Sequence, residues 1–236
     1  HLRTGQGGYY VEGYVAPGSY STLFLTAPGD FNPHSLQFVF FGNPTTPSSV
    51  QVGGLYLSWC SDSRIEFRGF DFGLVNVKSS RVYLNQCALN KLVALEQSSV
   101  QLDSCTLTTE FGGNLIHVES GSFLEAVNNT FVDLGALNAL IKVTRNAAVV
   151  WQSGSGSVTG KQYEVDLNGT IALPTGATIP GSLPGTALSG GQVQGTTDNR
   201  SIQSFELICS GEAEALTTGY DKAKIRLPYA FTISAV

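Results

Sequence analysis

The chain contains little charge, few histidines and no methionine. Charged residues make up 13% of its 236 residues, and the formal net charge is −5. This balance argues against nucleic acid as a partner, because contacts to phosphates require a basic surface. The sequence has only three histidines and four cysteines, and it contains no Cys-x-x-Cys motif. That composition predicts neither a metal site nor a bound cofactor.

Long hydrophobic runs and helix signals are also scarce. No apolar stretch approaches the roughly 20 residues that a membrane-spanning helix requires, so we expect no insertion into a membrane. The chain begins with His1, lacks Met and stops directly after a strand-like run at residues 231–234. We therefore expect more protein at both ends.

The sequence contains instead a repeated pair of apolar residues at positions i and i+2. The residue between them points to the opposite face of the strand. This period of two is the spacing of residues on one face of a strand. The pairs form three columns separated by polar corners. The first column contains Val75 and Val77, Val93 and Leu95, Ile116 and Val118, Ile141 and Val143, and Tyr163 and Val165. The second contains Ile65 and Phe67, Val82 and Leu84, Val100 and Leu102, Leu124 and Ala126, Val149 and Trp151, and Ile171 and Leu173. The third contains Phe70 and Phe72, Cys87 and Leu89, Cys105 and Leu107, and Asn129 and Phe131.

Three short strands per repeat are typical of one turn of a right-handed parallel β-helix. One turn cannot bury its apolar side alone, so stacked turns build a continuous core. The second column recurs after 17, 18, 24, 25 and 22 residues, and loops at residues 108–113 and 154–160 account for the longer steps. A β-sandwich with many short strands is the alternative. It is disfavoured because the polar corners at residues 78–80, 96–99 and 119–122 also match.

We expect an all-β protein in which the β-helix is followed by the beginning of a small β-sandwich module. Residues 1–49 form the N-terminal cap and the first β-helix strands, and residues 50–173 form the repeated turns. Residues 174–200, rich in Gly and Pro, are a closure and linker. Residues 201–236 begin the C-terminal β-sandwich module, which is truncated.

The columns place Cys60, Cys87, Cys105 and Trp151 in the core. Cys87 and Cys105 occupy one position in successive turns, so their Cα atoms lie about 4.8 Å apart. This separation permits a disulfide, but a ladder of buried thiols that pack as small hydrophobic groups is favoured. Asn129 takes the next place in that ladder, where its amide can satisfy backbone groups at the corner.

Three stretches of the sequence are similar to known proteins. Residues 15–20 (VAPGSY) and 36–42 (LQFVFFG) resemble the opening of pectate-lyase-like β-helices. Residues 183–193 (LPGTALSGGQV) resemble a Gly-rich segment that closes the β-helix in many bacteriophage tail fibres and tailspikes. Residues 216–219 and 225–233 (IRLPYAFTI) resemble the first strands of a β-sandwich module common in phage fibre proteins.

This resemblance to bacteriophage tail fibre and tailspike proteins implies a homotrimer in the virion that contacts other tail proteins. The implied function is a structural fibre or spike that recognises a glycan on the host cell surface and mediates attachment. The alternative is a tailspike depolymerase, a glycoside hydrolase or lyase that cleaves this polysaccharide. A cellular pectate-lyase-like enzyme is disfavoured, because no cluster of Asp ligands for Ca²⁺ falls on adjacent turns.

Cleavage of a glycan requires two carboxyl groups near the scissile bond. Glu96 and Glu119 lie in the corner stripe about one strand spacing apart, roughly 5 Å, and are the candidate catalytic pair. Lys78 lies in the same stripe and can neutralise Glu96, so a solvated ion pair at the corner is favoured over catalysis. The outward residues of the first column are Asn76, Ala94, His117, Lys142 and Glu164. Those of the second are Glu66, Tyr83, Gln101, Glu125, Val150 and Ala172.

Four outward residues are candidates for carbohydrate binding. Trp59 and Tyr83 offer rings that can pack against the CH faces of a sugar, although a subunit contact is favoured for Trp59. His117 and Lys142 lie outward on adjacent turns and can contact a sugar or an acid, with an ordinary polar exterior as the favoured alternative. Because the outward stripes hold few paired acids, the sequence favours a scaffold over an enzyme.

Overall fold

The computed structural model describes residues 2–5, 8–26, 36–60, 64–109, 113–133 and 138–195. These residues are all-β, apart from one short 3-10 helix, η1 (Pro47–Ser49). They belong to a compact unit that spans His1–Ile202. The β-sandwich module expected at residues 201–236, and the linker from residue 196 onward, lie outside the described residues.

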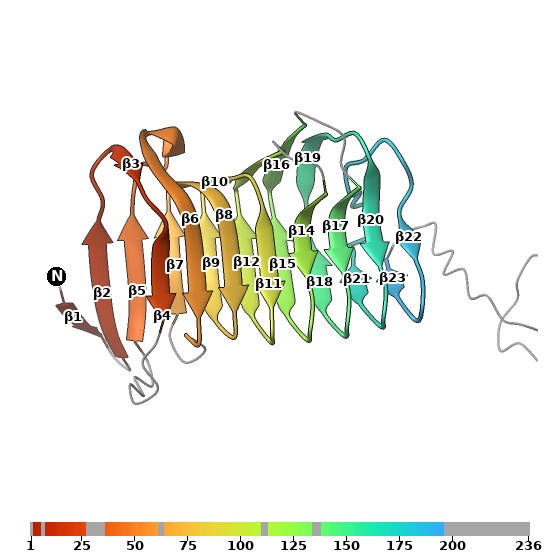
Figure 1. Ribbon diagram of the computed structural model, residues 1–236, viewed down its shortest axis with the longest axis horizontal. Coiled ribbons are helices and arrows are strands. Elements are labelled where there is room, and N and C mark those ends of the chain that lie inside the picture. The colour runs from red at the N-terminus through yellow and green to blue at the C-terminus, as the bar shows by residue number, and fades with distance from the viewer. Residues whose placement is uncertain are drawn as a thin grey trace, which may run out of the picture. The chain divides into compact units, whose positions relative to one another are not determined.

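The strands form two large sheets, and nearly all of their pairs are parallel (Figure 1). The first sheet has ten strands in the order β1 (Leu2–Gly5), β2 (Gly8–Tyr14), β5 (Leu36–Phe41), β7 (Arg64–Arg68), β9 (Arg81–Asn85), β12 (Ser99–Asp103), β15 (Phe123–Val127), β18 (Ala148–Trp151), β21 (Thr170–Ala172) and β23 (Gln192–Gln194). The second sheet runs in the order β19 (Gly154–Ser157), β16 (Asn129–Asp133), β13 (Thr106–Thr109), β10 (Ala88–Leu89), β8 (Asp71–Lys78), β11 (Leu92–Leu95), β14 (Asn114–Val118), β17 (Ala139–Val143), β20 (Lys161–Val165) and β22 (Thr186–Ala187). It is completed by β6 (Val50–Ser58), which pairs with β8, β3 (Gly18–Tyr20) and β4 (Leu23–Thr26).

The chain moves between the two sheets, and each strand lies beside the strand from the preceding turn. Thus β12 pairs with β9 on one side and β15 on the other. The long strand β8 pairs with β10 through its first residues and with β11 through its last residues, so the second sheet contains two of the three expected columns. This arrangement of long parallel strands in curled sheets is compatible with the predicted β-helix.

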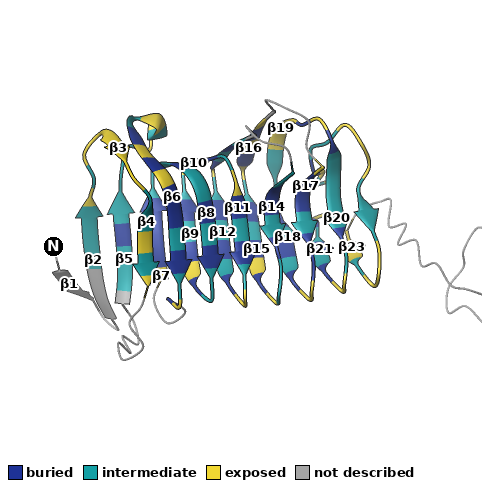
Figure 2. Ribbon diagram, in the orientation of Figure 1, coloured by how far each residue is buried: buried dark blue, intermediate teal, exposed yellow. Residues whose placement is uncertain are grey.

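The core lies between the sheets, where the columns stack. The structure confirms the second column, because each of its pairs is buried and Val82, Val100, Leu124 and Val149 are aligned across β9, β12, β15 and β18. It also confirms the third column, whose members Phe72, Leu89, Leu107 and Phe131 are aligned. Figure 2 shows buried residues alternating with more exposed ones along these strands.

The thiols and Asn129 lie in the core as expected. Cys60, Cys87 and Cys105 are buried and free, and burial together with the adjacent Cys87 thiol holds the pKa of Cys105 well above its ordinary value. The Oδ1 atom of Asn129 accepts a hydrogen bond from the Cys105 backbone N–H at 2.9 Å, and its Nδ2 atom donates to the Leu102 carbonyl at 3.4 Å. This amide therefore satisfies backbone groups of the preceding turn.

The corners use left-handed backbone at residues other than glycine. Trp59, Glu96, Ser104 and Asn128 have φ values of 61°, 52°, 55° and 54°. Such a residue costs roughly 1–2 kcal/mol. The cost is offset by bonds between turns, such as the hydrogen bond that the Ser104 N–H donates to the Val127 carbonyl at 3.0 Å.

The prediction for β11 was wrong by one residue. Leu92 and Ala94, not Val93 and Leu95, align with Val75 and Val77 and are fully buried. The larger side chains favoured the wrong register, but the register depends on the preceding column. Leu89 aligns with Phe72 and β8 is continuous, so the residue three positions later, Leu92, must align with Val75. The outward stripe therefore contains Val93 in place of Ala94.

Substitution by aspartate distinguishes the two registers. We expect Ala94→Asp to lower the free energy of unfolding by several kcal/mol, because it places an unpaired carboxylate in the core. Val93→Asp adds the same charge on the outer face and is expected to cost about 1 kcal/mol or less. Urea unfolding followed by circular dichroism measures both. If Val93→Asp destabilises the protein more than Ala94→Asp, the register with Val93 and Leu95 in the core is correct instead.

Candidate functional site

The outer face of the first sheet is a grid of side chains whose positions follow from the strand register. One row crosses β9, β12 and β15 and contains Arg81, Ser99 and Phe123, with Arg64 beside it at the start of β7. The next row crosses β7, β9, β12 and β15 and contains Glu66, Tyr83, Gln101 and Glu125. Neighbouring rows are about 6.7 Å apart along the strands, and neighbouring strands about 4.8 Å apart.

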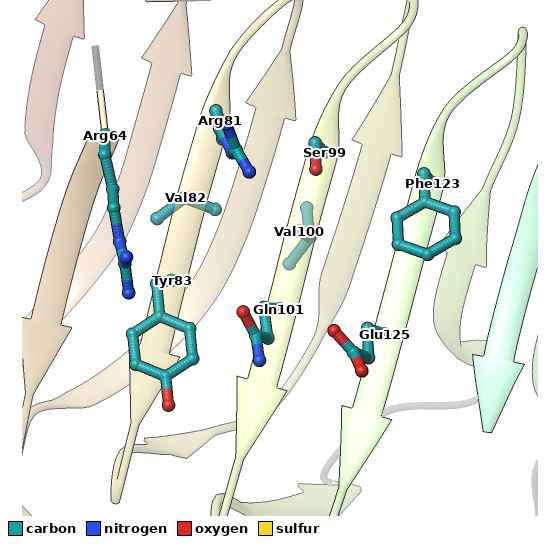
Figure 3. Close-up of a pocket in the computed structure, with 9 residues that line it drawn as sticks. All are labelled: Arg64, Arg81, Val82, Tyr83, Ser99, Val100, Gln101, Phe123 and Glu125. Carbon is teal, nitrogen blue, oxygen red and sulfur yellow. The ribbon is translucent and has the colours of Figure 1, made fainter. Parts of the chain in front are cut away.

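A groove of about 120 Å³ is hollowed into this grid (Figure 3). Ser99 and Gln101 lie along its middle, and Val82 and Val100, whose own side chains are buried, contribute to its floor. The groove is bounded on one side by the long side chains of β7 and β9, and on the other by those of β15. It exists because the short side chain of Ser99 lies between longer ones.

Arg64 and Tyr83 form a fixed wall of the groove. The Cζ atom of Arg64 lies 5.2 Å from the centroid of the Tyr83 ring, within cation–π range. The Tyr83 hydroxyl donates to Oδ2 of Asp103 at 2.9 Å and accepts from Nδ2 of Asn85 at 3.2 Å. Burial, followed by the bond to Asp103, raises the pKa of Tyr83. The phenol is therefore neutral near pH 7 and held in one orientation.

Glu66, in the same row as Tyr83, is almost completely buried at 1% exposure. It contacts Nε of Arg68, and its Oε2 atom lies 3.8 Å from Nη2 of Arg64. Buried carboxylates persist when cations accompany them. Glu66 is thus part of the support beneath Arg64 and does not line the groove.

The remaining groups of the groove are available for a ligand. Arg81 is exposed, and within the described residues neither its side chain nor that of Gln101 has a hydrogen-bond or ion-pair partner. The Phe123 ring is 39% exposed. Glu125 accepts a hydrogen bond from Nε2 of Gln152, which holds its carboxylate at the edge of the groove. A guanidinium, an amide, a carboxylate and an open ring face can together recognise a small polar ring compound.

Of the predicted carbohydrate-binding residues, only Tyr83 lines the groove. Trp59 lies at the corner after β6, is 59% exposed, and has Nζ of Lys78 at 5.7 Å from its ring centroid. His117 and Lys142 are aligned across β14 and β17 in the second sheet. They are brought together as expected, but on a different sheet from Tyr83.

The charges around His117 form a network. Its Nε2 atom lies 3.6 Å from Oε2 of Glu119, which also lies 3.7 Å from Nη1 of Arg145. Nζ of Lys142 lies 3.8 Å from Oε2 of Glu164. Burial lowers the pKa of His117; Glu119 opposes this shift, whereas Lys142, Lys91 and Arg145 reinforce it.

The predicted catalytic residues Glu96 and Glu119 are held by different cations. Nζ of Lys78 lies 3.0 Å from Oε1 of Glu96, which is the corner ion pair that the sequence favoured. Glu119 is engaged with His117 and Arg145. Both carboxylates lie in corners between the two sheets, Glu96 three residues before Ser99 and Glu119 four before Phe123, and neither is among the residues that line the groove.

Sequence reasoning identified part of the groove but not its full composition. Tyr83, Gln101 and Glu125 were correctly placed on the outward stripe of the second column. Arg81 and Phe123 were missed. They lie two residues before Tyr83 and Glu125 on the same strands, so the period of two also places them on the outer face, one row earlier. That signal was present in the column itself.

Comparisons of the chain with protein-family models, with curated proteins and with solved structures found no match. Within the described ranges, no helix is long and apolar enough to cross a membrane. The same residues contain no group of three or more His, Cys, Asp or Glu side chains that could hold a metal ion.

Stability should depend on pH through His117. Its pKa is lower in the folded protein than the ordinary value of about 6.5, so the unfolded chain takes up a proton that the folded protein resists. Folded stability is therefore greatest above about pH 6.5 and falls as the pH drops toward the folded pKa. We expect His117→Gln to lose less stability than the wild type between about pH 7 and pH 5. Urea midpoints across this range measure the difference.

The acidic residues titrate in both proteins, so the difference between the two pH profiles isolates the imidazole. Lys142→Gln is a useful companion, because it keeps the imidazole and removes a cation that lowers its pKa. Its profile should fall between the other two. Parallel profiles for the wild type and His117→Gln would show that the imidazole makes no contribution.

Proposed function

We propose that the stacked parallel strands of the two sheets form a right-handed parallel β-helix. We also propose that the protein is a structural fibre or spike of a bacteriophage virion. In this proposal it attaches the particle to a glycan on the host cell surface. The observation that carries the attachment function is the groove of β7, β9, β12 and β15, which holds unpartnered polar groups beside an exposed ring. The resemblance of residues 183–193 and 225–233 to phage fibre proteins supports the virion assignment.

The fold suits a rigid appendage. Every interior strand of the first sheet has a neighbour on both sides, so its backbone groups are paired along the stack. The core is continuous from Val50 to Ile179. A rod of this kind resists unfolding and proteolysis because few backbone groups are free to open locally.

The groove suits a sugar better than an apolar ligand. The Gln101 amide can both donate to and accept from hydroxyl groups, and the Arg81 guanidinium adds further donors. Phe123 provides a flat apolar surface for the CH groups of a pyranose ring. The open sheet on either side allows the remainder of a polysaccharide chain to continue past the groove.

Exposed aromatic residues support the expected homotrimer. Tyr14, Phe24 and Trp59 are 71%, 68% and 59% exposed, and Phe24 stacks on Tyr56 with ring centroids 5.1 Å apart. Aromatic residues are enriched at protein–protein interfaces relative to the rest of the surface. We propose that this N-terminal region contacts other copies of the chain or other tail proteins.

The depolymerase alternative has less support. Hydrolysis of a glycosidic bond generally uses two carboxyl groups, and Glu125 is the only carboxylate among the residues that line the groove. Glu96 and Glu119 each accompany a cation, Lys78 and Arg145, and do not line the groove. An attachment function requires no such pair.

Glycan binding and oligomeric state test this proposal. We expect the wild type to bind a subset of an array of bacterial surface polysaccharides, and Phe123→Ser to weaken that binding about tenfold through loss of ring contact. Val132→Ser removes an apolar side chain of similar exposure, 40% against 39%, from β16 of the second sheet and should leave glycan binding unchanged. Sedimentation should give the mass of a trimer.

Absence of polysaccharide binding would contradict the attachment function, and a monomer in sedimentation would contradict the fibre. The same polysaccharides are assayed for new reducing ends after incubation. Their appearance, and their loss in Glu119→Gln, would establish the depolymerase instead.

A further inference from the structure

We propose that the groove recognises an anionic sugar unit and places its charged substituent, a carboxylate or a phosphate, against Arg81. This inference rests on the proposed function, in which the groove binds a glycan. It goes further by assigning the chemical class of the sugar and its orientation on the sheet.

The charge of the groove is opposite to that of the chain. The formal net charge of the whole sequence is −5, whereas the lining contains Arg64 and Arg81 against the single acid Glu125, which gives +1. Glu66 does not alter this balance, because Arg68 already contacts its buried carboxylate. Asp103, which accepts from Tyr83, lies two residues beyond Gln101 on β12, so the positive charge is confined to the row of Arg81 and Ser99. That row favours an anion.

Arg81 differs from most cations of the described residues. Six other Lys and Arg side chains form ion pairs with carboxylates, namely Arg64, Arg68, Lys78, Lys142, Arg145 and Lys161. Arg81 forms none within the described ranges, and its guanidinium leans toward Ser99 (Figure 3). The short Ser99 side chain leaves space beside it, and the Ser99 hydroxyl can donate to the same anion. A guanidinium binds carboxylate or phosphate through two parallel hydrogen bonds.

The rest of the grid sets the orientation of the sugar. With the anionic group between Arg81 and Ser99, the ring lies toward Phe123 in the same row. Gln101 is one row away, about 6.7 Å along the strand, where it can bond ring hydroxyls. Glu125 lies at the far corner and accepts hydroxyl protons but repels a second anion. The reversed orientation, with the charged substituent at Glu125, is therefore disfavoured.

Three probes with one ring test the assignment: methyl glucoside, methyl glucuronoside and methyl glucoside 6-phosphate. They share a pyranose ring and differ in the group at carbon 6, which is neutral, a carboxylate or a phosphate. The 236-residue chain is titrated with millimolar concentrations of each probe, and its NMR signals are followed. We expect at least one charged probe to bind about tenfold more tightly than methyl glucoside, with the largest shifts at β9, β12 and β15.

Arg81→Gln should remove this preference, and Arg81→Lys should restore part of it. Arg145→Gln is the matched control, because it removes the same charge from an exposed arginine outside the groove, in the corner between β17 and β18. Arg81 is exposed, so unchanged melting temperatures are expected for the variants.

Equal binding of the neutral and charged probes, or a preference that survives Arg81→Gln, would overturn this inference and leave glycan binding intact. If Arg81→Gln and Arg145→Gln lose the preference for charged probes equally, the preference depends only on net charge. That result would also overturn this inference. If no probe changes the NMR signals of the groove residues, the assignment of an anionic sugar is wrong. The attachment function is judged separately, by binding to the polysaccharide array.

Discussion

Parallel pairing in register is the constraint on which the rest of the structure depends. Each turn places a residue directly beside its equivalent in the next turn, so similar side chains stack in columns. Phe40 and Phe67, which are register neighbours, stack with ring centroids 5.0 Å apart, and Tyr14 and Phe41 do so at the same distance. The same register organises the outer face, where it brings Arg81, Ser99 and Phe123 into one row although they are distant in sequence.

Packing within the columns requires compensation between neighbouring turns. Trp151 is fully buried and aligns with Ala126, the smallest member of its column. A Cβ atom on Gly154 would lie 2.6 Å from the Trp151 ring and 3.0 Å from Phe131. The large ring is therefore accommodated because Ala126 in the preceding turn and Gly154 at the start of β19 are both small. Such a core tolerates exchange of volume between turns better than addition of volume to one of them.

The sequence predicted most of this core because its evidence was local. A period of two and matching corners were sufficient for the second and third columns. The slip in β11 arose because side-chain size was weighed above the count from Leu89, and Ala94 is too small to mark a core position by itself. The burial of Glu66 could not be predicted from its stripe, since it depends on Arg64 and Arg68 folding over it from the same strand. For the same reason the groove became visible only when the lengths of neighbouring side chains were compared in space.

Each strand of the described part of the chain pairs mainly with the strands of the turns before and after it, so this part behaves as a one-dimensional array. A terminal turn is held by one neighbour and an interior turn by two, and fraying therefore begins at the ends and moves inward. The groove spans β7, β9, β12 and β15, with three strands before and three after them in the first sheet. The strands on either side therefore protect the groove. They can open and close locally at the ends while the four strands that form the groove stay paired.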